Sequence, residues 1–143
     1  MKAPLFDQIL AISQEISDAS TAENDILRKE HCKNLQKLCA TNQDSPNDHP
    51  LQWEALADFT EDGDQAIDIY QVGLHIAKKL KLEHYSASIY LAMAMRYQEF
   101  NEADKTLEFA QKAHSLVDSI DNNEFKTEII DFLHRLTKQS EHE

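Results

Sequence analysis

The chain of 143 residues contains very little glycine and proline. It has 2 glycines and 3 prolines, and all the prolines lie at or before Pro50. Proline breaks helices, so no proline interrupts helix formation through the second two-thirds of the sequence. The length suits one domain with a single core.

The sequence also lacks long apolar runs. The longest uninterrupted apolar stretches are only a few residues, so we expect no segment that spans a bilayer. The N-terminus carries aspartate and glutamine where an export signal needs a continuous apolar run. Cys32 and Cys39 are seven residues apart on one side of an expected helix, too far apart for a disulfide. We therefore expect a soluble, cytoplasmic protein with two reduced thiols.

Basic residues are scarce. There are 14 lysines and arginines against 26 acidic residues, a net charge of −12, and no lysine or arginine lies between Lys37 and Lys78. Nucleic acids and anionic membranes attract positively charged proteins. Because this chain is negatively charged, neither is an expected partner. A basic protein is the natural complement, since opposite potentials accelerate encounter. The alternative is that the acidity only maintains solubility.

Residues 66–96 repeat themselves 40 positions later. The segment AIDI at 66–69 returns as TLEF at 106–109, and Gly73 returns as Ala113. A period of this size indicates stacked helix pairs, none of which can bury its apolar face alone.

Apolar residues recur at helical spacing in seven segments, and none shows sustained strand alternation. We expect an all-α protein with helices at about 4–18, after a cap at Ser20 or Thr21 with an apolar line that reaches Cys39, from Pro50 to Phe59, and at about 64–81, 84–99, 102–120 and 123–138. Residues 1–45 form an N-terminal pair for capping or self-assembly, packed as one domain with 46–143.

Residues 50–138 resemble tetratricopeptide repeats of the longer variety, about 40 residues each. The matching residues in the clearest copy are the aromatic and small side chains of its two helices: Tyr90, Met93, Ala94, Tyr97, Thr106, Ala110 and Ala113. The resemblance implies a right-handed superhelical array of antiparallel helix pairs. Small residues let helices approach closely, so Ala94 and Ala113 should be buried, and Trp53 should lie largely buried in the first copy.

The resemblance also implies a binding surface, because non-motif positions of each first helix line the concave face of such arrays. Carried over residue by residue, these positions are Glu54, Asp58 and Glu61, then Leu91, Met95, Gln98 and Glu99, and finally Glu128, Asp131 and Arg135. The implied groove is acidic, with an apolar floor at Leu91 and Met95. Repeats that clamp a C-terminal carboxylate carry lysine, arginine and asparagine here, which disfavours that ligand.

No pattern indicates a metal, a cofactor or catalysis. Residues 58–64 superficially resemble a calcium loop, but the twelfth place holds Ile69 where a glutamate is required. The 7 histidines form no i, i+4 pair, and none partners a cysteine at metal spacing. No serine lies in a glycine elbow, and two glycines cannot make a phosphate cradle.

We therefore expect a non-catalytic module that binds a basic protein through an acidic concave face. The role we favour is an immunity-type inhibitor that masks a basic toxin. A secretion chaperone is an alternative. A structural or scaffold subunit that self-assembles through residues 1–45, for example as a homodimer, is another.

Overall fold

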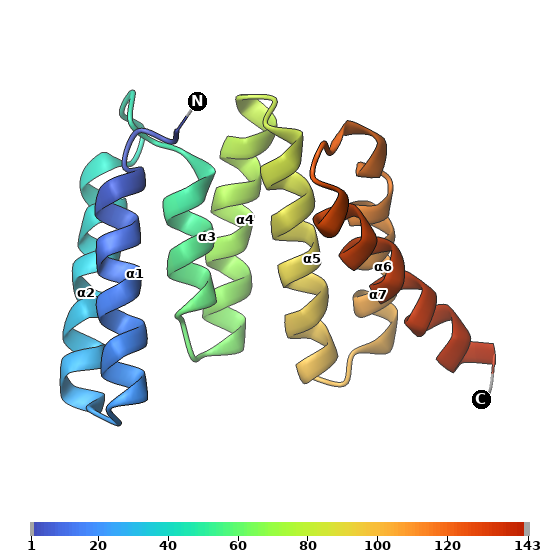
Figure 1. The fold of residues 1–143 in the computed structure, drawn as a ribbon, viewed down its shortest axis with the longest axis horizontal. Coiled ribbons are helices and arrows are strands. Elements are labelled where there is room, and N and C mark those ends of the chain that lie inside the picture. Colours follow the sequence, from blue (N-terminus) through green and yellow to red (C-terminus); the bar gives the residue numbers. More distant parts are fainter. Residues whose placement is uncertain (1, 142–143) are drawn as a thin grey trace. The chain divides into compact units, whose positions relative to one another are not determined.

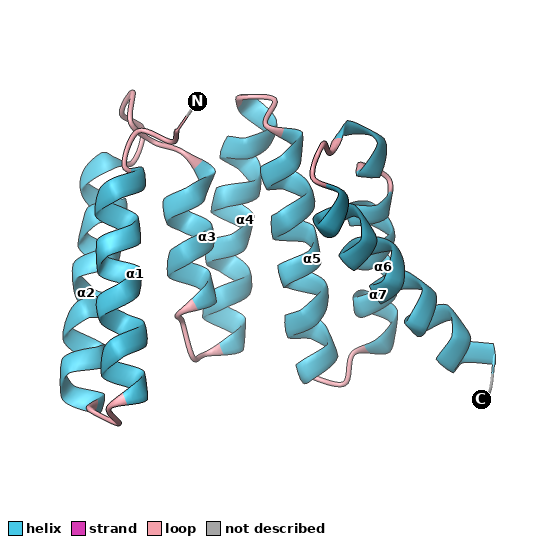
Figure 2. Ribbon diagram, in the orientation of Figure 1, coloured by secondary structure: helices cyan, strands magenta, loops and turns pink. Residues whose placement is uncertain are grey.

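The computed structural model describes residues 2–141 (Figures 1 and 2), and this part of the chain is all-helical. It contains seven α-helices and one 3-10 helix: α1 (Phe6–Thr21), α2 (Asp25–Asn42), α3 (Pro50–Asp58), α4 (Gly63–Lys79), α5 (Glu83–Glu99), α6 (Ala103–His114), η1 (Val117–Ser119) and α7 (Asn123–Glu141). The all-α prediction is confirmed. The chain forms two compact units, Met1–Ile76 and Ala77–Glu143, which are described separately.

The last four α-helices begin at a constant interval. Their first residues are Gly63, Glu83, Ala103 and Asn123, 20 residues apart. The 40-residue interval of the sequence is therefore present in the helix starts, with α6 corresponding to α4 and α7 to α5.

Three helices end with the same backbone hydrogen-bond pattern. Glu23, Lys81 and Asn101 adopt left-handed conformations, with φ of 57°, 58° and 59°. The next N–H then donates to the carbonyl five residues earlier: Asn24 to Ala19 (2.9 Å), Leu82 to Ala77 (2.8 Å) and Glu102 to Tyr97 (3.0 Å). This Schellman pattern satisfies carbonyls at the helix end and usually employs glycine. Here it turns the chain without one.

Three predicted helix boundaries are wrong. The end of α1 is Thr21 rather than a residue near 18. The cap of α2 is Asn24, whose side-chain oxygen accepts a hydrogen bond from the Leu27 N–H (3.0 Å), rather than Ser20 or Thr21. The reason is that the first helix continues to Thr21 and ends through its backbone pattern. Similarly, α6 ends at His114, because i→i+3 bonds such as Leu116 N–H to Ala113 O (3.1 Å) replace the α-helical ones.

The core of the first unit lies where α1, α2 and α3 pack together and α4 joins them. Its buried members are apolar: Ile16, Leu35, Cys39, Trp53, Leu56 and Ile76. Trp53 is 8% exposed, as predicted, and its Nε1–H donates to Asp48 Oδ1 (2.7 Å).

Cys32 and Cys39 are free thiols. Burial raises the pKa of Cys39 to about 12, so that thiol is uncharged.

In the second unit, α5 and α6 form the most extensive helix–helix contact. Ala94 and Ala113 are each 0% exposed, which confirms their predicted burial. The Phe109 ring fills the adjoining space, stacked on Tyr97 with centroids 5.3 Å apart and tilted against Tyr90 at 6.2 Å. Small and large side chains thus alternate at this contact, which gives a dense interior.

A larger side chain at either alanine should overpack this contact. Ala94→Leu and Ala113→Leu should each cost about 1–3 kcal/mol of unfolding free energy, measured by urea denaturation. Ala103→Leu, at an exposed position in the first turn of α6, is the matched control and should change stability little. Equal stability of all three variants and the wild type would show that the helices do not cross at these alanines.

The start of α3 depends on a neutral histidine. His49 Nδ1 accepts a hydrogen bond from the Leu51 N–H (3.1 Å), and Pro50 occupies the first helical turn. Burial lowers the pKa of His49 from its ordinary value of 6.5, although the nearby Asp48 carboxylate opposes the effect. Protonation would place a second N–H where the cap needs an acceptor.

Because the folded protein binds this proton less readily than the unfolded chain, stability should fall as pH is lowered through about 6.5. His49→Asn keeps an acceptor at the cap and should show a smaller loss between pH 7.5 and 5.5 in urea denaturation. His114→Asn, at an exposed position, is the control for removal of one histidine. The same pH dependence in His49→Asn and wild type would contradict the assignment.

Candidate partner-binding surface

The ten predicted binding residues fall in both units. Glu54, Asp58 and Glu61 belong to the first unit, on α3 and the turn after it. Their spacing of four and three residues places the two helical ones on one face. Glu54 is half-buried, whereas Asp58 and Glu61 are exposed.

These acidic side chains of the first unit already have partners. The Asp58 carboxylate accepts a hydrogen bond from the Tyr70 hydroxyl of α4. Glu61 Oε1 lies 2.7 Å from Arg28 Nη2, which also contacts Asp25 at 2.8 Å. Both interactions connect elements within the unit, so part of this predicted surface has a structural role.

On α5, the predicted residues differ in accessibility. Leu91 is 4% exposed and offers almost no surface to a partner, whereas Met95 is 38% exposed. Gln98 and Glu99 are exposed, and Glu99 Oε2 lies 3.9 Å from Arg96. The predicted apolar floor is therefore reduced to Met95.

Gln98 also lines a pocket of about 360 Å³ between α5, the start of α6 and the end of α7, where Leu136 and Gln139 face it. This pocket brings α5 and α7 together at one end of the second unit. At the other end, the His84 and Phe125 rings lie with centroids 5.1 Å apart. The helices that carry the predicted residues of this unit are thus neighbours.

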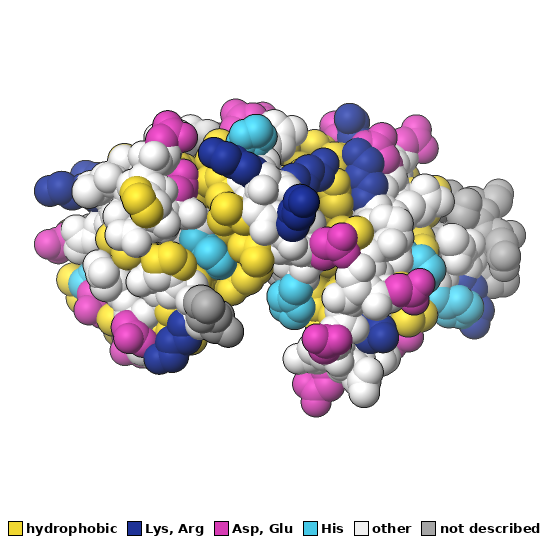
Figure 3. All heavy atoms as spheres, turned by 90° about the horizontal axis from the view of Figure 1, so that it is seen from above, with side chains coloured by type: hydrophobic (Ala, Val, Ile, Leu, Met, Phe, Trp, Pro, Cys, Tyr) yellow, Lys and Arg dark blue, Asp and Glu magenta, His cyan; other side chains and the backbone are white. Residues whose placement is uncertain are grey.

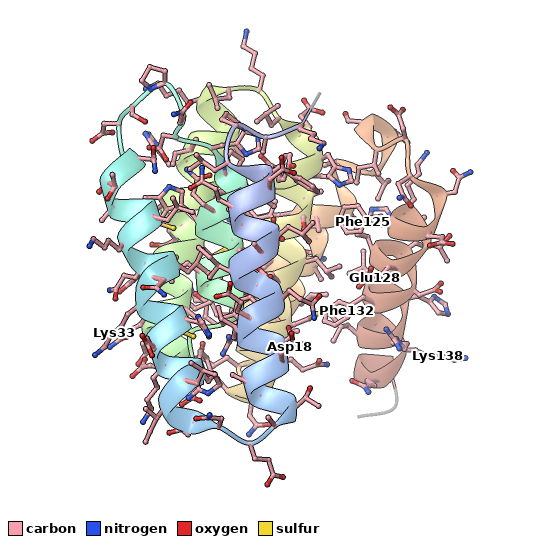
Figure 4. All side chains as sticks on the ribbon, turned by 60° about the vertical axis from the view of Figure 1, so that its left-hand side comes forward. Asp18, Lys33, Phe125, Glu128, Phe132 and Lys138 are labelled. Carbon is pink, nitrogen blue, oxygen red and sulfur yellow. The ribbon has the colours of Figure 1, made fainter. Side chains whose placement is uncertain are left out.

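On α7, Glu128, Asp131 and Arg135 are all exposed. Figure 4 shows Glu128 on the same side of α7 as Phe132, whereas Lys138 projects from the opposite side. No ion pair joins Glu128 or Asp131 to another residue within 2–141. Their charges are therefore available to a partner.

The segment 58–64 uses its carboxylates to shape a turn. Asp58 bonds to Tyr70, and Asp62 Oδ1 accepts a hydrogen bond from the Gln65 N–H (3.0 Å) at the start of α4. Across residues 2–141, no three histidine, cysteine, aspartate or glutamate side chains gather as a metal site would require.

The sequence did not predict a pocket of about 450 Å³ in the second unit, lined by Lys78, Lys81 and Lys112 around Tyr90. Figure 3 looks down on the helix ends where the α4–α5 turn lies and shows Lys and Arg side chains gathered there. The available signal was the return of lysine at residue 78 after the interval without basic residues. The position of Lys112 beside it follows only from the packing of α6.

Comparisons of the chain with protein-family models, curated proteins and solved structures found no match. The tetratricopeptide resemblance therefore stays a prediction. Among the helices within residues 2–141, none is long and apolar enough to cross a membrane.

The Asp58–Tyr70 contact can be tested separately from binding. Asp58→Ala and Tyr70→Phe should be non-additive, with a coupling free energy of about 1–2 kcal/mol in a double-mutant cycle, because the hydrogen bond joins a hydroxyl to a charged group. Unfolding free energies from urea denaturation give the cycle. Asp68→Ala replaces an exposed carboxylate of α4, and its cycle with Tyr70→Phe should give a coupling near zero. Additive effects of the first pair would rule out a structural role for the bond.

Proposed function

We propose that this chain is a non-catalytic, tetratricopeptide-like module that binds a basic protein. The observation that carries the proposal is the pair of exposed, unpaired carboxylates on α7, Glu128 and Asp131, at two of the predicted concave positions. The 40-residue interval of helix starts and the net charge of −12 support it.

The binding mechanism is electrostatic attraction followed by contact at an adaptable apolar side chain. A single exposed carboxylate contributes only about 0.2–1 kcal/mol to binding, but the summed field accelerates encounter with a basic surface. Met95, with its flexible thioether and 38% exposure, supplies apolar contact next to Gln98 and Glu99.

The role we favour is an inhibitor of the immunity type, located in the cytoplasm, that masks the basic surface of a toxin. Two free thiols are in keeping with a reducing compartment. A secretion chaperone would use the same surface.

A scaffold subunit that self-assembles through its N-terminal helices is the second candidate. Exposed apolar side chains in that region favour it, since Leu10 is 57% exposed and Ile26 is 83% exposed. Leu10 in α1 and Ile26 at the start of α2 are apolar side chains that self-association would cover. In that case the acidic residues would only maintain solubility.

The test begins with purification of the tagged chain from its native host and identification of the bound protein. Association of the two purified proteins is then measured at low and physiological salt. Joint reversal of Glu128 and Asp131 to lysine should slow association roughly 2–10-fold and flatten its salt dependence, since steering follows the summed charge. Met95→Asp should instead speed dissociation, because it places a charge in the contact.

The control reverses Asp118 and Asp121 together, two exposed acids outside the predicted surface with the same change in net charge. It should slow association less. Equal effects of the two double reversals would mean that net charge alone matters, and the α7 surface would be excluded. Loss of binding only on Leu10→Asp and Ile26→Asp would favour the N-terminal helices.

A further inference from the structure

A pocket of about 450 Å³ in the second unit is lined by lysines from α4, the turn after it and α6, and we call it the lysine pocket. Lys78 lies near the end of α4, Lys81 in the turn before α5, and Lys112 near the end of α6. Tyr90 and Ser86 of α5 line the same pocket. Three lysines thus line one pocket, although Lys112 lies far from Lys78 and Lys81 in the sequence.

The Tyr90 ring holds two of these lysines in place. Lys78 Nζ lies 5.5 Å and Lys112 Nζ 5.9 Å from its centroid, distances at which an aromatic ring attracts a cation. Lys112 Nζ is also 4.7 Å from the centroid of Phe109. Two like charges near one ring repel each other, and an anion close to both would offset that repulsion.

The pocket has the opposite sign to the chain as a whole. Neither Lys78 nor Lys81 makes an ion pair with any residue that the structure describes, and Lys112 Nζ is 3.5 Å from Glu108 Oε2. Glu83 is the one acidic residue among those that line the pocket. Two lysines of the pocket thus have no acidic partner in the part of the chain that the structure describes, although the chain has 26 acidic residues. Their positive charge is available to an anion.

A serine and a helix start add donors to the lysines. Ser86, in the first turn of α5, lines the pocket and is 4% exposed as a whole residue. Its hydroxyl can donate a hydrogen bond to an anion in the pocket. The 17-residue helix α5 begins at the pocket without a side-chain cap, so its first N–H groups and positive dipole end favour an anion.

We infer that the lysine pocket binds a phosphate group, either inorganic phosphate or the phosphate of a monoester. Lysine binds phosphate as a point charge, whereas planar carboxylates are best matched by the arginine fork, and arginine is absent from this lining. The positive charges of the three lysines complement the charge of about −2 that a phosphate group carries near neutral pH. The side chains of Leu82, Leu116 and Tyr90 give an organic group an apolar wall.

Titration of the full chain with inorganic phosphate tests the inference. Two-dimensional amide NMR at pH 7.5 should show saturable shifts centred on residues 83–86, and sodium acetate at matched ionic strength should not reproduce them. Phenyl phosphate is the second probe. Tighter binding of phenyl phosphate indicates a monoester as the ligand, and equal binding indicates inorganic phosphate.

Variants separate a built site from general charge attraction. Lys78→Gln and Lys112→Gln should each weaken phosphate binding roughly tenfold, and Ser86→Ala should weaken it at unchanged melting temperature. Glu83→Gln should strengthen binding, because it removes the opposing charge. Lys79→Gln is the matched control, an adjacent exposed lysine outside the lining.

Shifts that do not saturate, or that acetate reproduces, would overturn the inference. So would an equal loss of affinity in Lys79→Gln and Lys78→Gln. These outcomes leave the acidic surface untouched, because no residue of that surface lines the lysine pocket.

Discussion

Close approach of helices at small side chains is the constraint on which the second unit depends. Ala94 on α5 and Ala113 on α6 are fully buried, and the Phe109 ring fills the space beside them against Tyr90 and Tyr97. Larger side chains at the alanines would separate the helices, and smaller ones at the rings would leave cavities. The same contact positions the Tyr90 ring, which packs against Phe109 of α6. The ammonium groups of Lys78 and Lys112 both lie near this ring.

The same constraint explains how α7 differs from α5, although the two helices occupy corresponding places in the 40-residue interval. Ala87 and Ala94 of α5 are each 0% exposed, whereas their counterparts on α7, Thr127 and His134, are polar and exposed. Small buried side chains are therefore present at these two positions of α5 and absent from α7, where larger polar ones face solvent.

Periodicity predicted those features that depend on one helix at a time. The seven helices and the exposure of Glu128 follow from which face of each helix is apolar. The end of α1 did not follow, since Glu23 gives no glycine-like signal for a left-handed turn. Periodicity also did not predict the contacts between helices. The Asp58–Tyr70 bond and the position of Lys112 beside the α4 terminus depend on packing distances that one helix does not encode.

The acidic excess of the chain does not cancel the positive charge of the lysine pocket. At physiological salt, exposed charges are largely screened beyond about 8 Å, so a ligand in the pocket responds mainly to the groups that line it. Among these groups the lysines outnumber Glu83 by three to one. Short screening lengths thus allow one small chain to combine a net negative charge with a local cluster of positive charge.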